Sequence, residues 1–145
     1  MGIKNVRIIF HTPWAYEDTS KVLAAADVLV LPTKGEQSLA SVPSKLLSYL
    51  LASKPILAMV LPESVSADVI EKAACGWIVS PNNIDLLAKK VDKLASLPEQ
   101  LLDKMGYAGR QYALQNFTTE SCLPKVIEII KNATQVEKSS REEKN

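Results

Sequence analysis

The chain has little cysteine and no long apolar run, and each shortage excludes a class of protein. Its two cysteines, Cys75 and Cys122, stand in different contexts without metal-ligand spacing. We therefore expect reduced thiols, as in a cytosolic protein, and no cysteine metal site. The longest apolar run, at about Leu46–Leu61, is interrupted by the triplet Ser53-Lys54-Pro55. No segment is therefore long enough to span a bilayer.

The chain also lacks an excess of either charge. Lys and Arg number 17 and Asp and Glu number 16, which gives a formal net charge of +1. Neither nucleic acid nor an anionic membrane surface is therefore expected as a partner. The single histidine, His11, has no serine or cysteine partner motif, which argues against triad catalysis. No basic-then-apolar signal segment opens the chain, which favours a cytoplasmic location.

Short apolar runs alternate with segments of helical spacing over the first 80 residues. This pattern predicts an α/β domain, a parallel Rossmann-like sheet of about four strands with helices on both faces and a C-terminal helical segment. We expect strands at 6–10, 28–31, 56–60 and 77–79, and helices at 17–26, 44–52, 66–74, 84–97, 99–116 and 119–134. The length supports one domain, residues 1–134. Residues 135–145 are charged without apolar anchors and are predicted to be disordered.

The most informative stretch is a strand–loop–helix–strand pattern between residues 27 and 60. A buried strand ends at Pro32, a polar loop covers Thr33–Val42, and a helix opened by Pro43-Ser44 leads to the next strand. In a parallel βαβ unit this loop lies at the carboxyl end of the strand. Open α/β sheets bind anionic ligands there, because free N–H groups and the helix dipole point outward. The loop is therefore the predicted ligand site.

A set of short motifs in this order resembles the donor-binding half of the family-four glycosyltransferases with the GT-B fold. The resemblance covers about Asn5–Lys131. The motifs are DVLVLP at 27–32, VPSKLLSYL at 42–50, KPILA at 54–58, ACGWIVSP at 74–81, DLLA at 85–88, MG at 105–106 and NFT at 116–118. The implied function is transfer of a sugar from a UDP- or GDP-sugar to an acceptor, in polysaccharide or glycolipid synthesis, without a cofactor. A complete enzyme of this kind is cytoplasmic or peripheral at the inner membrane face.

The resemblance also implies that parts of such an enzyme are absent from this chain. The donor domain of the family begins with two further βα units, which carry a glycine-bearing turn and an arginine–lysine pair for the diphosphate. The acceptor domain is absent as well and would come from a missing N-terminal part or a partner chain. We therefore expect a partial GT-B donor domain that is inactive alone. The two absent strands would lie between Val6–Phe10 and Val28–Leu31, so self-association through unpaired edges is expected.

The predicted donor contacts centre on the loop and helix at 36–48. Helix amides near Ser41 and Ser44 would hold the diphosphate, and Lys45 would add a point charge. By resemblance, two glutamates with seven residues between them contact the transferred sugar and the ribose, but Ala40 and Ser48 occupy those positions. Ser48 retains one hydrogen bond for the ribose, and Glu36 would serve the sugar only in a rearranged loop. The alternatives are a solvated surface lysine for Lys45 and an exposed turn residue for Glu36.

Two further loops at the same edge of the sheet are candidate contacts. By resemblance, Thr12 and Trp14 lie beside the nucleotide base, which Trp14 would stack upon; the alternative is packing of Trp14 on the helix at 17–26. Ser64 and Ser66 would approach the phosphates or the sugar. For Ser66, capping of the next helix is the preferred interpretation.

Other residues are assigned to packing. Trp77 is expected in the core, Gly106 and Gly109 at a helix contact, and Cys75-Gly76 at the C-cap of the helix at 66–74. A non-catalytic protein that binds a nucleotide or a partner is the alternative function. A receiver-like signalling domain is excluded, because no acidic residues follow the predicted strands.

Overall fold

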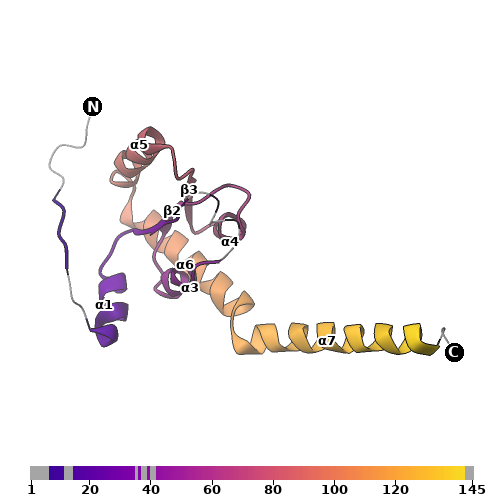
Figure 1. Ribbon diagram of the computed structural model, residues 1–145. Helices are drawn as coiled ribbons and strands as arrows, with labels where there is room; N and C mark the ends of the chain where they lie inside the picture. Colours follow the sequence, from indigo (N-terminus) through magenta and orange to yellow (C-terminus); the bar gives the residue numbers. More distant parts are fainter. Residues whose placement is uncertain (1–6, 12–14, 35, 37–38, 40–41, 143–145) are drawn as a thin grey trace.

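A computed structural model describes the backbone of residues 7–11, 15–34, 36, 39 and 42–142, with side chains up to residue 134. A parallel sheet lies at the centre of the body and one long helix extends away from it (Figure 1). The elements are η1 (Tyr16–Asp18), α1 (Thr19–Ala24), β1 (Leu29–Pro32), α3 (Ser44–Leu51), β2 (Ile56–Met59), α4 (Val65–Lys72), β3 (Gly76–Val79), α5 (Ile84–Leu94), α6 (Glu99–Asn116) and α7 (Thr119–Glu142).

The sheet has the order β1-β2-β3, and both pairs are parallel. Helices lie over both faces of the sheet, but only the central strand β2 is buried along Ile56–Ala58; alternate residues of the edge strand β1, among them Val30, are exposed. One face packs on α3, α4 and α6 through a core that includes Leu31, Leu50 and Ile70. The other face packs on α5 and its flanks, where Leu57, Val79 and Leu94 are buried together. The predicted α/β architecture with helices on both faces is therefore confirmed.

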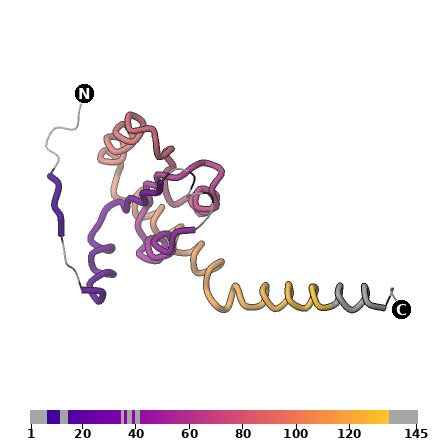
Figure 2. Tube along the Cα trace, viewed as in Figure 1, coloured from indigo at the N-terminus to yellow at the C-terminus, as the bar shows by residue number. Residues whose placement is uncertain are grey.

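The prediction of a strand at 6–10 is wrong for the residues that the structure describes. Residues 7–10 form no strand, and the sheet contains three strands in the described part of the chain instead of four. The segment runs beside the body without joining the sheet (Figure 2). Its apolar side chains Ile8, Ile9 and Phe10 are exposed. A strand sequence needs a neighbouring strand for its hydrogen bonds, and none is present beside it.

Helix α6 crosses α3 at two glycines, as the sequence analysis predicted. A Cβ atom on Gly106 would lie 2.0 Å from the carbonyl oxygen of Ser53, and one on Gly109 would lie 2.9 Å from the Cβ of Cys75. The guanidinium of Arg110 donates a hydrogen bond to the carbonyl oxygen of Leu51, at the C-terminus of α3. The close approach therefore holds the end of α3 against α6.

Two helix ends use a left-handed residue that is not glycine. Ser53, after α3, has φ 56°, and Ala74, after α4, has φ 48°. The predicted C-cap at Cys75-Gly76 is therefore wrong by two residues, because the C-cap is Ala73 and the left-handed residue is Ala74. Gly76 is needed for a different reason, because a Cβ atom there would meet the carbonyl oxygen of Ile56 in the neighbouring strand, 2.0 Å away.

The last helix begins at a reciprocal cap. The amide of Ser121 donates to Oγ1 of Thr118 at 3.2 Å, and the amide of Thr118 donates to Oγ of Ser121 at 3.1 Å. This confirms Thr118 as a capping residue. The helix α7 was expected to end near residue 134 and continues to Glu142, while disorder of 135–145 stays a prediction. No described helix is long and apolar enough to cross a membrane.

Candidate functional site

The carboxyl ends of the three strands meet at one edge of the sheet, where α3 and α4 begin. Thr33, which follows β1, links two of these ends. Its Oγ1 donates to the carbonyl oxygen of Met59 at 2.6 Å, and its amide donates to the same oxygen at 3.2 Å. The exit of β1 is therefore tied to the last residue of β2. This fixes the strand ends from which the two helices depart.

The first turn of α3 is open to solvent. Pro43 is the N-cap residue, makes no side-chain cap bond, and accepts the amide of Leu46 through its carbonyl oxygen at 2.9 Å. Within the described part of the chain, the amides of Ser44 and Lys45 have no hydrogen-bond acceptor. Both side chains are exposed, and Lys45 forms no ion pair with a described residue. Two N–H groups without an acceptor among the described residues therefore lie beside one ammonium at an exposed turn.

The buried face of α3 explains why this turn is held in place. Leu46 and Leu50 are buried in the main core, one turn apart on the face toward the sheet. Ser44 and Ser48 are spaced by four residues, so they share a different face of the same helix. Both of these serines are exposed. The helix therefore presents a polar stripe while its apolar stripe anchors it.

Ser48 borders a pocket of about 460 Å³ between α3 and the η1–α1 segment. The pocket places Ser48, a residue of the predicted site, beside η1 and α1, which follow the first apolar run in the sequence. Sequence reasoning missed the contribution of η1 and α1, although their polar residues follow the loop that was expected near the base. The lining residues are Tyr16, Glu17, Thr19, Ser20, Leu23, Ser48, Leu51 and Ala52.

At the start of α4, the capping residue is Ser64 and not Ser66. The Oγ of Ser64 accepts the amide of Ala67 at 3.2 Å, and the residue is 2% exposed. Ser66 is the second residue of α4 and is fully buried, and its Oγ has no hydrogen-bond partner in the structure described. The preferred interpretation of Ser66 as a cap was therefore wrong. A donor contact for Ser64 stays a prediction, and its hydroxyl already has a structural partner.

The remaining predicted contacts are not brought together by the described structure. Ser41, Thr12 and Trp14 lie outside the described residues. Glu36 is exposed, as its alternative interpretation expected, and its carbonyl oxygen accepts the amide of Leu39 at 2.9 Å. Ser44, Lys45 and Ser48 are thus the predicted contacts that share one described element.

Thiol and metal chemistry find little support in the described part of the chain. Burial raises the pKa of the Cys75 thiol to about 11, so it is protonated at neutral pH. Burial also raises the pKa of Tyr49. Among the described residues, no group of three or more His, Cys, Asp or Glu side chains is arranged to hold a metal ion.

Comparison with known proteins gives the family. Residues 2–112 match the family model described as glycosyl transferases group 1. A probable glycosyltransferase, WbjE of Pseudomonas aeruginosa, is 30% identical over 103 residues, which is 71% of this chain and 25% of that protein. The chain thus spans about a quarter of the length of this relative. No solved structure gives a significant match. The family model covers well over half of the chain and agrees with the resemblance carried by its motifs; the chain belongs to the group 1 glycosyltransferases.

Proposed function

We propose that this chain is the donor-binding portion of a glycosyltransferase that moves a sugar from a UDP- or GDP-sugar in polysaccharide or glycolipid synthesis. The observation that carries the proposal is the open first turn of α3. Its free amides at Ser44 and Lys45 stand beside an exposed ammonium, one turn from a pocket bordered by Ser48. A nucleoside diphosphate has the matching order of groups, since its phosphates adjoin the ribose.

The chemistry of sugar transfer explains why a helix start suits this role. Negative charge develops on the diphosphate as it leaves the sugar, and fixed donors aimed at that charge lower the barrier. The α3 amides are fixed because Leu46 and Leu50 anchor the helix in the core. The charge of Lys45 adds a contribution that is screened by solvent and salt. The proposed diphosphate site therefore uses backbone dipoles first and one side-chain charge second.

The ribose and base would extend from this turn toward the pocket between α3 and η1–α1. Ser48 offers one hydroxyl for the ribose, and the pocket of about 460 Å³ adjoins it. Thr12 and Trp14 remain proposed base contacts on sequence grounds, and Ser41 and Glu36 remain proposed contacts to the phosphate and the sugar.

A second function is favoured by a specific observation. The two positions where the resembled family carries glutamates are Ala40 and Ser48 in this chain. Ala40 has no group that could contact the transferred sugar. A protein that binds a nucleotide or a partner without transferring sugar is therefore the alternative.

The test is an NMR titration of the full chain with UDP and with GDP, followed through backbone amide shifts. We expect the shifts to centre on the first turn of α3 and on Ser48, with a dissociation constant of about 1 mM for a site with few charged contacts. Lys45→Ala should weaken binding about fivefold, because one exposed charged contact contributes about 1 kcal/mol. The matched control is Lys89→Ala, which removes an exposed lysine from α5.

Titration with the free nucleosides separates the contact of Lys45 with the diphosphate from the contact of Ser48 with the ribose. With uridine or guanosine, the effect of Lys45→Ala should disappear while that of Ser48→Ala persists, since only the ribose contact remains. Shifts confined to the opposite end of the sheet, or no shifts at all, would refute the donor site. Transfer to an acceptor by this chain alone would exclude the non-catalytic alternative, and it would also refute the expectation that the chain is a donor-binding portion without activity of its own. Binding without transfer is the result expected of a chain that spans a quarter of its relative.

A further inference from the structure

The sheet ends at β1, whose outer edge has no strand beside it in the described part of the chain. On the inner side, the amides of Leu29 and Thr33 donate to carbonyl oxygens of Pro55 and Met59, at 2.9 and 3.2 Å. Alternate residues of a parallel strand direct their peptide groups to opposite sides, so the N–H and C=O of Val30 point to the outer edge. An unpaired edge of this kind is a template for another strand.

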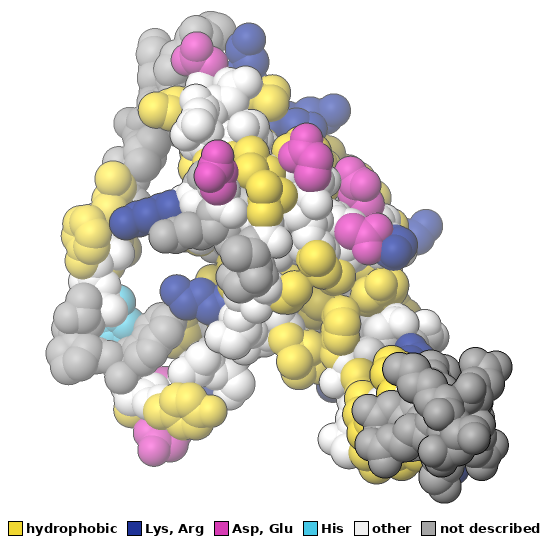
Figure 3. Space-filling model, turned by 45° about the vertical axis from the view of Figure 1, so that its right-hand side comes forward, with side chains coloured by type: hydrophobic (Ala, Val, Ile, Leu, Met, Phe, Trp, Pro, Cys, Tyr) yellow, Lys and Arg dark blue, Asp and Glu magenta, His cyan; other side chains and the backbone are white. Residues whose placement is uncertain are grey.

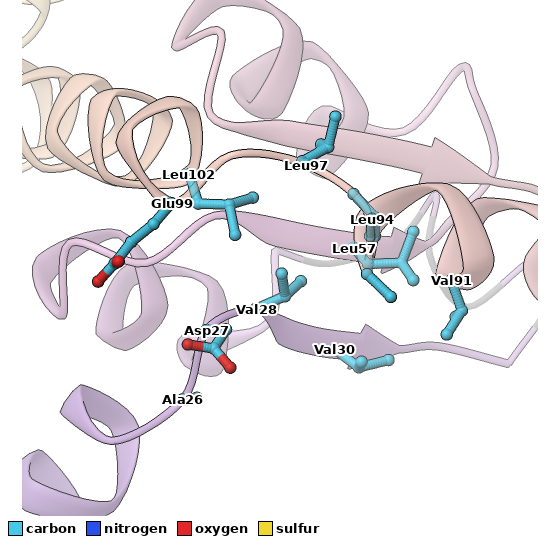
Figure 4. A pocket seen from close by; sticks show the side chains of 11 residues that line it. Ala26, Asp27, Val28, Val30, Leu57, Val91, Leu94, Leu97, Glu99 and Leu102 are labelled. Atoms are coloured by element: carbon cyan, nitrogen blue, oxygen red, sulfur yellow. The ribbon is translucent and has the colours of Figure 1, made fainter. Parts of the chain in front are cut away.

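An apolar pocket of about 720 Å³ adjoins this edge. Its valine and leucine side chains come from β1, β2, α5 and the start of α6, and they point toward one another (Figure 4). The carboxylates of Asp27 and Glu99 lie at the end of the pocket where β1 begins (Figure 4). The edge therefore combines an apolar surface with a local negative charge. The apolar lining includes Val28, Val30, Leu57, Val91, Leu94, Leu97 and Leu102.

The chain carries an exposed apolar segment of matching length. Residues 7–10 lie apart from the body in the trace (Figure 2), and the space-filling view shows an opening between an outlying strip of side chains and the rest of the molecule (Figure 3). Ile8, Ile9 and Phe10 are 73%, 68% and 88% exposed. Three adjacent apolar side chains at such exposure are a surface that associates with other apolar surfaces. Arg7 places one positive charge at the start of this segment.

We propose that residues 7–10 of one copy of this chain pair as a parallel strand with the outer edge of β1 of a second copy, and that the exchange is reciprocal. A parallel direction brings Arg7 to the end where Asp27 and Glu99 lie, whereas an antiparallel direction would carry it to the opposite end. In the register that places Arg7 beside Val28, Ile9 lies beside Val30 and over the apolar pocket. The charges and the apolar pattern thus favour one orientation.

We assign the added strand to a second copy of the chain, and not to the same copy, for two reasons. The segment of the same chain lies apart from β1, and η1 and α1 come between the two along the chain (Figure 1). Exchange of an identical element between two copies is also a low-cost route to a symmetric dimer. The formal net charge of +1 offers little repulsion against it. The dimer would remove two apolar segments and two open edges from water at once.

Sedimentation velocity of the full chain, from about 10 μM to about 1 mM, tests the proposal, with dimerisation expected near 100 μM for a small interface. Ile9→Asp should raise the dissociation constant at least about tenfold, because an inward charge blocks strand pairing. The matched control is Ile129→Asp on α7, where the isoleucine is equally exposed, at 68%. The control should dimerise like the unchanged chain.

Charge reversal and hydrogen exchange test the orientation and the register. Arg7→Glu should weaken dimerisation several-fold, and a second change, Asp27→Arg, should restore it. The amide of Val30 should become protected from exchange only at concentrations where the dimer forms. A monomer throughout the concentration range would overturn the proposal. So would loss of dimerisation in Ile129→Asp alone, or protection of Val30 at every concentration, which would indicate pairing within one chain.

Discussion

The contact of α6 with the end of α3 predicts a large cost for one added methyl group. In Gly106→Ala the new Cβ atom would lie 2.0 Å from the carbonyl oxygen of Ser53, 2.5 Å from its carbonyl carbon and 3.0 Å from the Cα of Lys54. All three atoms belong to the backbone, so no side chain can rotate away. The two helices must separate by at least about 1 Å to reach ordinary van der Waals contact.

The free energy follows from three contributions. Overpacking of a close contact costs about 1–3 kcal/mol. Separation also weakens the hydrogen bond from Arg110 to the carbonyl oxygen of Leu51, and bonds to charged groups contribute about 1.5–3 kcal/mol, less where solvent reaches them. Alanine returns about 1 kcal/mol through its higher helix propensity. We therefore expect the free energy of unfolding to fall by about 2–4 kcal/mol.

Urea unfolding followed by far-ultraviolet circular dichroism measures this change. Gly109→Ala should cost less, because its Cβ atom would meet the Cβ of Cys75 at 2.9 Å and Cδ2 of Leu50 at 3.1 Å, both farther than the 2.0 Å contact at Gly106, and the Leu50 methyl can rotate away. Gln115→Ala, at an exposed position of α6, serves as the propensity control. A Gly106→Ala protein as stable as the unchanged chain would refute the close contact, since helix propensity would then be the dominant effect.

Three further predictions concern backbone strain, pH and capping. Ser53→Gly and Ala74→Gly should each stabilise the fold by about 0.5–1 kcal/mol in urea unfolding, because glycine relieves the left-handed strain but gains entropy in the unfolded chain. Burial raises the pKa of the Cys75 thiol from its ordinary value of 9.0 to about 11 in the folded protein, so the stability that the protonated thiol contributes is complete below pH 9 and is lost as the pH rises through 11. The free energy of unfolding should therefore fall between pH 8 and pH 11 by about 2 kcal/mol more in the unchanged chain than in Cys75→Ala. Ser64→Ala should cost about 1 kcal/mol as a lost N-cap, whereas Ser66→Ala should cost nothing or stabilise the fold, because it removes a buried hydroxyl without a partner.

The sequence predicted the elements whose signals are local. The strands β1 and β2 and the helix α3 were found within about one residue of their ends, because apolar runs and Pro43 mark them directly. The caps were harder to predict. Both Ser64 and Ser66 are good capping residues, and the choice between them depends on where the loop Leu61–Ser64 closes, through a hydrogen bond from the amide of Ser64.

The first apolar segment and the smaller pocket show where local signals fail. Residues 7–10 have strand-like side chains, but strand structure requires hydrogen bonds from a neighbour, which a sequence pattern does not supply. The smaller pocket beside Ser48 was missed for a similar reason. Tyr16 and Leu23 line it from η1 and α1 only because the fold places these elements beside α3, and no spacing in the sequence encodes that placement.

The two proposals concern different sides of one small sheet, which is why they can be separated. The donor site uses the carboxyl ends of the strands, where Thr33 ties β1 to β2 and the α3 amides face solvent. The association surface uses the outer edge of β1 and the pocket toward α5. Lys45 and Ser48 do not line that pocket, and Ile9 does not line the pocket beside Ser48. The described residues that carry nucleotide binding, Ser44, Lys45 and Ser48, are therefore distinct from Ile9 and Val30, which carry self-association. Thr12 and Trp14 follow the exchanged segment directly, so the proposed base contacts would depend on both.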